Sequence, residues 1–142
     1  MPAQDHPLAP FERLVGGEWH MEQSHQVFEW AVGGKAIRAR SYIASDDAPV
    51  LVGEGAWFWH PDDRVIRGYQ LADGMGVDLF EYTSRWEGDT LVSELLAFDA
   101  AGTATEYRET WEFTGPDAYE WTLFVKTPHG LQRAMGGTFT RR

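Results

Sequence analysis

The chain has 142 residues, no cysteine, and 22 acidic against 12 basic side chains, which gives a net charge of −10. This length is typical of a single domain, here residues 1–142. Without cysteine, disulfides and thiolate metal sites are excluded. The acidic balance argues against a nucleic-acid partner, and the apolar stretches are far shorter than the ~20 residues of a membrane helix. With no secretory signal visible, we expect a cytoplasmic protein without nucleic-acid or membrane partners.

One short helical turn is expected in the N-terminal lead, residues 1–16. Residues 8–15 place apolar side chains at helical spacing, and the pair Gly16-Gly17 is a typical helix end. From Glu18 onward, apolar residues alternate with polar ones, which indicates strands. The expected strands are 18–24, 26–32, 35–44, 50–60, 64–72, 76–87, 90–99, 105–113, 119–126 and 131–141.

The connections between these strands indicate how the sheet is built. Most are hairpin-short and contain turn-forming residues, such as Gly88-Asp89 and the segment 114–118. Strands in meander order favour a barrel, and closure removes the exposed edges of an aromatic-rich sheet. We therefore predict an all-β fold: one antiparallel up-and-down β-barrel of nine or ten strands.

The late strands show the clearest inward faces. In strand 105–113, Glu109 shares a face with Tyr107 and Trp111. In strand 131–141, Arg133 shares a face with apolar neighbours. Small-molecule sites combine apolar walls with a few polar groups, so these faces are candidates for a cavity lining. The ligand-binding residues predicted there are Tyr107, Trp111, Tyr119, Trp121, Arg133 and Met135.

The two charges on these faces have two interpretations. Glu109 could act as an acid or base, because desolvation or a nearby arginine shifts the pKa of a carboxyl group. Glu109 and Arg133 could instead pair with each other and only stabilise the barrel. A second candidate catalytic residue is His60, which would titrate near neutral pH at a cavity mouth. Its position before Pro61 also suits an ordinary turn residue.

The sequence does not decide which face of strand 50–60 points into the barrel. Trp57 and Trp59 share one face, whereas Phe58 lies on the other. If the tryptophans point inward, they belong to the ligand-binding set. One of these two aromatic sets then faces outward, where the N-terminal segment or a second subunit would cover it. Exposed aromatic surface of this kind marks an interface, and on this ground we expect a homodimer.

Metal and cofactor sites are not expected. His20 and His25 lie five residues apart in what reads as one extended segment, so they should point to opposite faces and form no metal site. The sequence contains no nucleophile elbow and no phosphate-binding loop.

Several motifs resemble those of a known superfamily. Gly17-Glu18-Trp19 after a short helical turn looks like the Gly-x-Trp that opens the first strand of lipocalins and other calycins, and Arg141-Arg142 resembles the arginine that packs over that tryptophan. The longer pattern is similar to a group of uncharacterised bacterial calycin-like domains. Its further parts are Phe28-Glu29-Trp30, Gly33-Gly34, Gly53-Glu54-Gly55, Trp111-x-Phe113, Gly115-Pro116-Asp117 and Thr138-Phe139-Thr140. The resemblance implies a barrel of about ten strands with an apolar cavity, and it implies no reaction.

The residues suggest two functions, and the resemblance implies a third. The first is binding of a small hydrophobic or aromatic molecule, without a cofactor. The second is a cofactor-free enzyme of isomerase, cyclase or hydratase type, with Glu109 as acid or base. The third is a haem protein of nitrobindin type. Nitrobindins place a histidine in the last strand, where this chain has Met135, and the nearest histidine, His129, lies in an expected turn.

Overall fold

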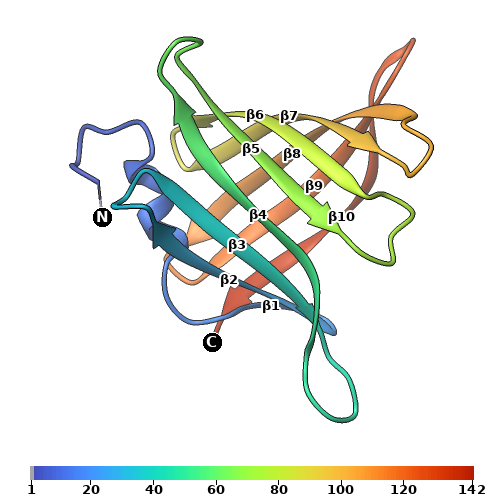
Figure 1. The fold of residues 1–142 in the computed structure, drawn as a ribbon, viewed down its shortest axis with the longest axis horizontal. Coiled ribbons are helices and arrows are strands. Elements are labelled where there is room, and N and C mark those ends of the chain that lie inside the picture. Colours follow the sequence, from blue (N-terminus) through green and yellow to red (C-terminus); the bar gives the residue numbers. More distant parts are fainter. Residues whose placement is uncertain (1) are drawn as a thin grey trace.

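The computed structural model describes residues 2–142 and shows a closed antiparallel β-barrel of ten strands with one short 3-10 helix (Figure 1). The predicted all-β barrel with a short N-terminal helical turn is confirmed. The helix is η1 (Ala9–Leu14). The strands are β1 (Trp19–Met21), β2 (Ser24–Ala31), β3 (Ala36–Ile43), β4 (Val50–His60), β5 (Val65–Ala72), β6 (Leu79–Glu87), β7 (Thr90–Phe98), β8 (Ala104–Gly115), β9 (Ala118–Thr127) and β10 (Gly130–Arg141).

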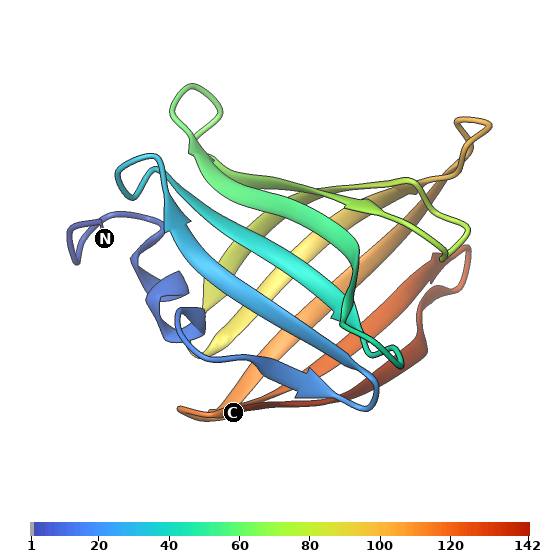
Figure 2. The same cartoon turned by 60° about the horizontal axis from the view of Figure 1, so that its bottom comes forward.

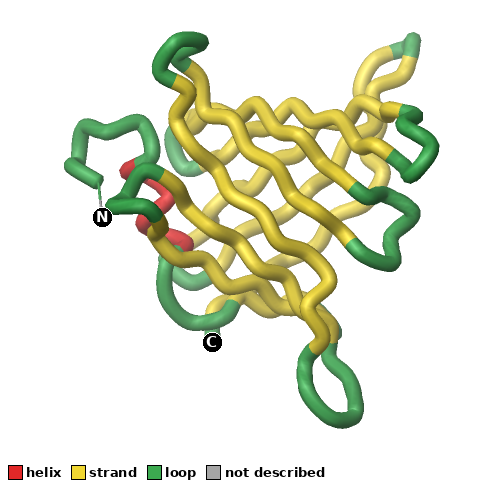
Figure 3. Tube along the Cα trace, in the orientation of Figure 1, coloured by secondary structure: helices red, strands yellow, loops and turns green. Residues whose placement is uncertain are grey.

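Each strand pairs with its neighbours in the chain, and β1 closes the barrel by pairing with β10. Strands make up the wall and loops lie at its two ends, as Figure 3 shows. The antiparallel order brings the β2–β3, β4–β5, β6–β7 and β8–β9 turns to one end, where η1 also lies (Figure 2). We call this the η1 end, and we call the opposite end the far end. Within residues 2–142, no helix has the length and apolarity needed to cross a membrane.

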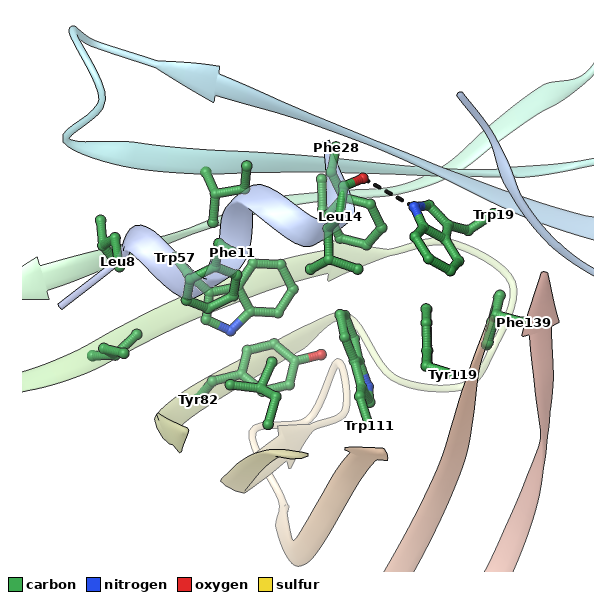
Figure 4. Close-up of a cluster of buried hydrophobic side chains, with 14 of the residues drawn as sticks. Leu8, Phe11, Leu14, Trp19, Phe28, Trp57, Tyr82, Trp111, Tyr119 and Phe139 are labelled. Atoms are coloured by element: carbon green, nitrogen blue, oxygen red, sulfur yellow. Dashed lines mark hydrogen bonds between the residues drawn. The ribbon is translucent and has the colours of Figure 1, made fainter. Parts of the chain in front are cut away.

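Aromatic side chains fill the η1 end (Figure 4). Phe11 of η1 is fully buried, and its ring centroid lies 5.9 Å from that of Trp57 and 5.2 Å from that of Trp86. Trp19 donates a hydrogen bond of 2.9 Å from Nε1 to the carbonyl oxygen of Leu14. The guanidinium of Arg141 lies 4.6 Å from the Trp19 ring centroid, which confirms the expected packing of a terminal arginine over this tryptophan. The helix therefore closes this end of the barrel.

A glycine makes room for the largest side chain in this core. Gly68 on β5 lies directly opposite Trp57 on β4. A Cβ atom at Gly68 would lie 2.7 Å from Cδ1 of Trp57 and 3.0 Å from the carbonyl oxygen of Ala56, which is too close for either pair. The indole thus packs directly over backbone, as glycine in a strand interior permits.

The first predicted strand, 18–24, is wrong in one respect. The chain turns back at Glu22, which has a positive φ of 53°, so that β1 and β2 form a hairpin. His20 and His25 are therefore directly opposite each other on neighbouring strands and share one face of the sheet. The expectation that they point to opposite faces fails because it assumed one continuous strand.

Candidate functional site

Glu109 of β8 faces the barrel lumen. Its cross-strand partners are Ser93 on β7 and Leu123 on β9, and Ser93 is only 2% exposed. Two positions further along β8, Trp111 lies opposite Trp121 of β9. Residues at alternate positions and their direct cross-strand partners share a face, so all five side chains point inward.

Both oxygens of the Glu109 carboxylate accept hydrogen bonds from tryptophan. Nε1 of Trp111 donates to Oε1 over 3.0 Å, and Nε1 of Trp121 donates to Oε2 over 3.0 Å. A carboxylate oxygen can accept more than one hydrogen bond, so each retains acceptor capacity beyond its indole partner. The two indoles hold the carboxylate in a defined orientation within an apolar wall.

The surroundings of Glu109 favour its neutral form. Burial raises the pKa of Glu109 from its ordinary value of 4.5 to about 7, against the opposing effect of the indole hydrogen bonds from Trp121 and Trp111. None of the described residues contributes a positive charge that lowers this pKa. Glu109 nevertheless keeps part of its surface exposed to solvent. Near pH 7 the group therefore exists in both protonation states, as acid–base chemistry and reversible ion pairing both require.

Two tyrosines lie within electrostatic reach of this carboxylate. Burial, and secondarily the charge of Glu109, raise the pKa of Tyr82 and of Tyr119 well above the ordinary value of 10.0. Both phenols are therefore neutral at physiological pH. The hydroxyl of Tyr119 donates to Oε1 of Gln26 over 2.6 Å. These groups add hydrogen-bonding capacity to the aromatic lumen without adding charge.

The hydroxyl oxygens of Ser84 on β6 and Ser93 on β7 lie 2.6 Å apart and share a hydrogen bond. They face the lumen beside Glu109. The sequence analysis did not select Ser84, Ser93, Tyr82 or Gln26. Only Tyr82 carried a signal, because it alternates with Phe80 and Trp86 in its strand.

Solvent exposure of the inward face changes along the barrel axis. The fully buried part of the aromatic core lies around η1, with Trp59, Trp86 and Phe113 partly buried at its rim. Tyr107, Leu123 and Val125, which face inward toward the far end, are partly exposed. Met135, opposite Leu123, is 50% exposed. Glu109 lies between the solid core and this solvent-reached half.

Arg133 does not belong to this site, which corrects the sequence analysis. The register of β10 against β9 shifts between Arg133 and Met135, so Arg133 pairs with Phe124 on the outer face, whereas Met135 pairs with the inward Leu123. The guanidinium of Arg133 lies over Gly136 on this outer surface. A β-bulge inserts one residue and reverses the alternation beyond it. Arg133 therefore does not pair with Glu109.

The inward face of β4 is the one that carries Trp57 and Trp59. Trp57 is 1% exposed in the core of the η1 end, and Trp59 packs against that core. Trp57 is thus part of the solid end of the barrel, away from the solvent-reached half. The aromatic residue on the outer face of β4 is therefore Phe58, and the expected homodimer stays a prediction.

The candidate histidines lie in turns. His60 ends β4 at the η1 end, where its Nδ1 accepts a hydrogen bond of 3.1 Å from the backbone N–H of Asp63. It thus stabilises the β4–β5 turn and lies on a different strand from Glu109. His129 is exposed in the β9–β10 turn, and its backbone N–H donates to Oγ1 of Thr127. Neither imidazole faces the lumen around Glu109.

A hollow of about 410 Å³ lies on the outside of the wall, mainly over β5 to β8. Its lining includes Glu81, Glu94 and Lys126. Glu94 already accepts contacts of 2.6 Å from Arg108 and 2.8 Å from Lys126. With Glu94 and Lys126 paired on an open surface, this hollow offers less to a ligand than the lumen around Glu109.

The chain matches no family model, and no curated protein matches it. The functional argument therefore rests on the geometry of the lumen.

Proposed function

We propose that the protein binds a small hydrophobic or aromatic molecule in the far-end half of the barrel, with Glu109 as its polar anchor. The observation that carries the proposal is the Glu109 carboxylate, held by two indole N–H groups at the boundary between a solid aromatic core and a solvent-reached lumen. The closed ten-stranded barrel is consistent with a calycin-like carrier, a class built around such a cavity.

The chemistry around Glu109 favours one kind of polar group on the ligand. Glu109 has acceptor capacity to spare and none of the described residues supplies it with a positive charge. A ligand with a protonated nitrogen would supply that charge, and the rings of Tyr107 and Trp121 would add cation–π attraction. We therefore propose an apolar or aromatic body that carries an amine.

Intrinsic tryptophan fluorescence tests this proposal, because Trp111 and Trp121 bind the anchor directly. The probes are paired: 2-phenylethylamine against 2-phenylethanol, and longer alkylamines against the matching alcohols. We expect the amines to bind more tightly, and we expect Glu109→Gln to remove that preference. Glu112→Gln is the matched control, because Glu112 is exposed on the same strand. No fluorescence response in any pair, or an equal response in the Glu109→Gln protein, would contradict the proposal.

A second candidate function is favoured by the pKa of about 7 at Glu109. A carboxyl group with this pKa can take up and return a proton at neutral pH, which suits a cofactor-free isomerase, cyclase or hydratase. Turnover of a hydrophobic substrate that disappears in Glu109→Gln, while fluorescence still reports binding, would favour the enzyme. Turnover should then rise through pH 7 if Glu109 acts as base. Binding without turnover across the panel would favour the carrier.

A further inference from the structure

Three side chains with metal-binding chemistry meet on the outside of the β1–β2 hairpin. Glu18 directly precedes β1, His20 lies on β1, and His25 lies opposite His20 on β2. Glu18 is fixed by two backbone hydrogen bonds with Arg142: its N–H donates to the Arg142 carbonyl over 3.0 Å, and its carbonyl accepts from the Arg142 N–H over 2.8 Å. All three residues are thus held by strand pairing rather than by a free loop.

The donor atoms of these residues converge. Nε2 of His20 lies 2.8 Å from Oε1 of Glu18, and Nε2 of His25 lies 3.9 Å from Oε2 of the same carboxylate. One ligand atom from each residue lies within 4.8 Å of the others. In a tetrahedral zinc site, bonds of 2.0–2.2 Å place neighbouring ligand atoms about 3.4 Å apart. The 2.8 Å and 3.9 Å separations in the hairpin bracket that value, so the three donor atoms already lie close to the spacing of a zinc site.

His25 is held in place without a strong partner of its own. It is 9% exposed, and its ring stacks between those of His20, at 5.0 Å, and Tyr42, at 4.9 Å. The 3.9 Å to Glu18 is too long for a hydrogen bond, so Nε2 of His25 is directed at the carboxylate without bonding it. A buried imidazole with this geometry is preorganised for a ligand placed between the two groups.

We propose that Glu18, His20 and His25 form a binding site for one divalent transition-metal ion of the Zn²⁺ class. Two imidazoles and one carboxylate suit Zn²⁺, Co²⁺, Ni²⁺ and Cu²⁺, whereas Ca²⁺ and Mg²⁺ prefer oxygen ligands alone. Three protein ligands leave a fourth position for water. The guanidinium of Arg142 also acts on Glu18 electrostatically, so the ion has to bind against a nearby positive charge.

The position of the site gives it a structural consequence. β1 has three residues, and its register with β10 covers Trp19 and His20, extended by the Glu18–Arg142 backbone hydrogen bonds. It is the shortest strand pairing in the barrel wall. An ion bound by Glu18, His20 and His25 would fasten β1 to β2 beside this closure. Metal that binds the folded chain and not the unfolded one raises the apparent stability. We therefore expect Zn²⁺ to stabilise the barrel against unfolding at the β1–β10 seam.

The test uses the full chain, without an affinity tag and stripped with a chelator. Isothermal titration with Zn²⁺ should give one ion per chain. His20→Gln, His25→Gln and Glu18→Gln should each weaken binding about tenfold or more, since even groups that only support metal ligands affect affinity by about 10–100-fold. His129→Gln is the matched control, because it removes an exposed histidine from the β9–β10 turn. Affinity should fall as the pH is lowered, because the metal binds only the neutral form of an imidazole.

Co²⁺ keeps the test decisive if His25→Gln disturbs packing. Tetrahedral Co²⁺ absorbs visible light strongly, so the wild type and His129→Gln should develop this band, whereas the exposed variant Glu18→Gln should lose it. Circular dichroism of each variant checks folding independently. The proposal is overturned if the wild type does not bind Zn²⁺, or if His129→Gln loses as much Zn²⁺ affinity as the three site variants. Glu18 and its histidines would then be an ordinary histidine–carboxylate contact.

Discussion

Replacing Glu109 by glutamine should make the barrel less sensitive to pH. Burial raises the pKa of Glu109 from 4.5 to about 7, so between these values the folded protein binds more protons than the unfolded chain. The unfolding free energy must then fall as pH rises through this window, by about 1.36 kcal/mol per unit. The full stabilisation is present below pH 4.5 and is lost above pH 7. Allowing for partial solvent access to Glu109, the loss is about 2–3 kcal/mol.

Urea denaturation of the wild type and of Glu109→Gln, from about pH 4.5 to pH 8, measures this effect. The quantity to follow is the difference between their unfolding free energies as a function of pH. Glutamine has one carbonyl oxygen, so one of the two indole N–H groups loses its acceptor, which costs about 1–3 kcal/mol at every pH. The stability of Glu109→Gln relative to the wild type should therefore start negative and rise by about 2–3 kcal/mol with pH. Glu112→Gln should show no such rise, because Glu112 is exposed. A flat difference for Glu109→Gln would refute the reasoning.

Three further substitutions probe the packing that positions the site. Gly68→Ala should lower the unfolding free energy by about 1–3 kcal/mol in urea, because its Cβ would lie 2.7 Å from Trp57. Ser84→Ala should destabilise by about 1–3 kcal/mol in the same assay, because it leaves the buried hydroxyl of Ser93 without its partner. Trp19→Phe should lower Tm, because it removes the hydrogen bond that ties the first strand to η1.

Each of these substitutions has its own control. Gly115→Ala should leave stability near the wild-type value, because no atom lies within 4 Å of its Cβ position, and an equal loss there would contradict the packing argument. Combining Ser84→Ala with Ser93→Ala should destabilise less than the sum of the single changes, and strict additivity would show that the two hydroxyls do not interact. For Trp19, unchanged thermal unfolding would mean that η1 is held without it.

The sequence predicts the barrel well because the strands and turns of an up-and-down barrel are marked by local residue patterns. Alternation identifies the strands, and short glycine-containing connections such as Gly88 between β6 and β7 identify the turns. The sequence analysis misses the hairpin at Glu22 because no glycine or Asn-Gly pair marks the turn. Glu22, a non-glycine residue, adopts the positive φ. This one missed turn also hides the apposition of His20 and His25.

The site was only partly predictable, for a related reason. Glu109 is visible as a charge on an apolar face, and Trp111 and Trp121 are visible as its neighbours in a cavity wall. That both indoles bind the same carboxylate follows from the register of β8 against β9, which a single sequence does not state. The bulge next to Arg133 is marked in the sequence only by Gly136-Gly137 shortly after it, yet it reverses the face of Arg133. Sequence periodicity assigns faces only where the alternation is unbroken.

The cost of Glu109 to the fold is itself an argument for function. Buried ion pairs also perturb pKa values, and such a structural explanation would require a cation beside the carboxylate. The bulge removes Arg133 from that role, and the partners that remain are the neutral indoles of Trp111 and Trp121. Two neutral hydrogen bonds leave the pKa at about 7, so the charged form destabilises the barrel at neutral pH. A cationic ligand beside the carboxylate would relieve this destabilisation, which supports the proposed binding of an amine.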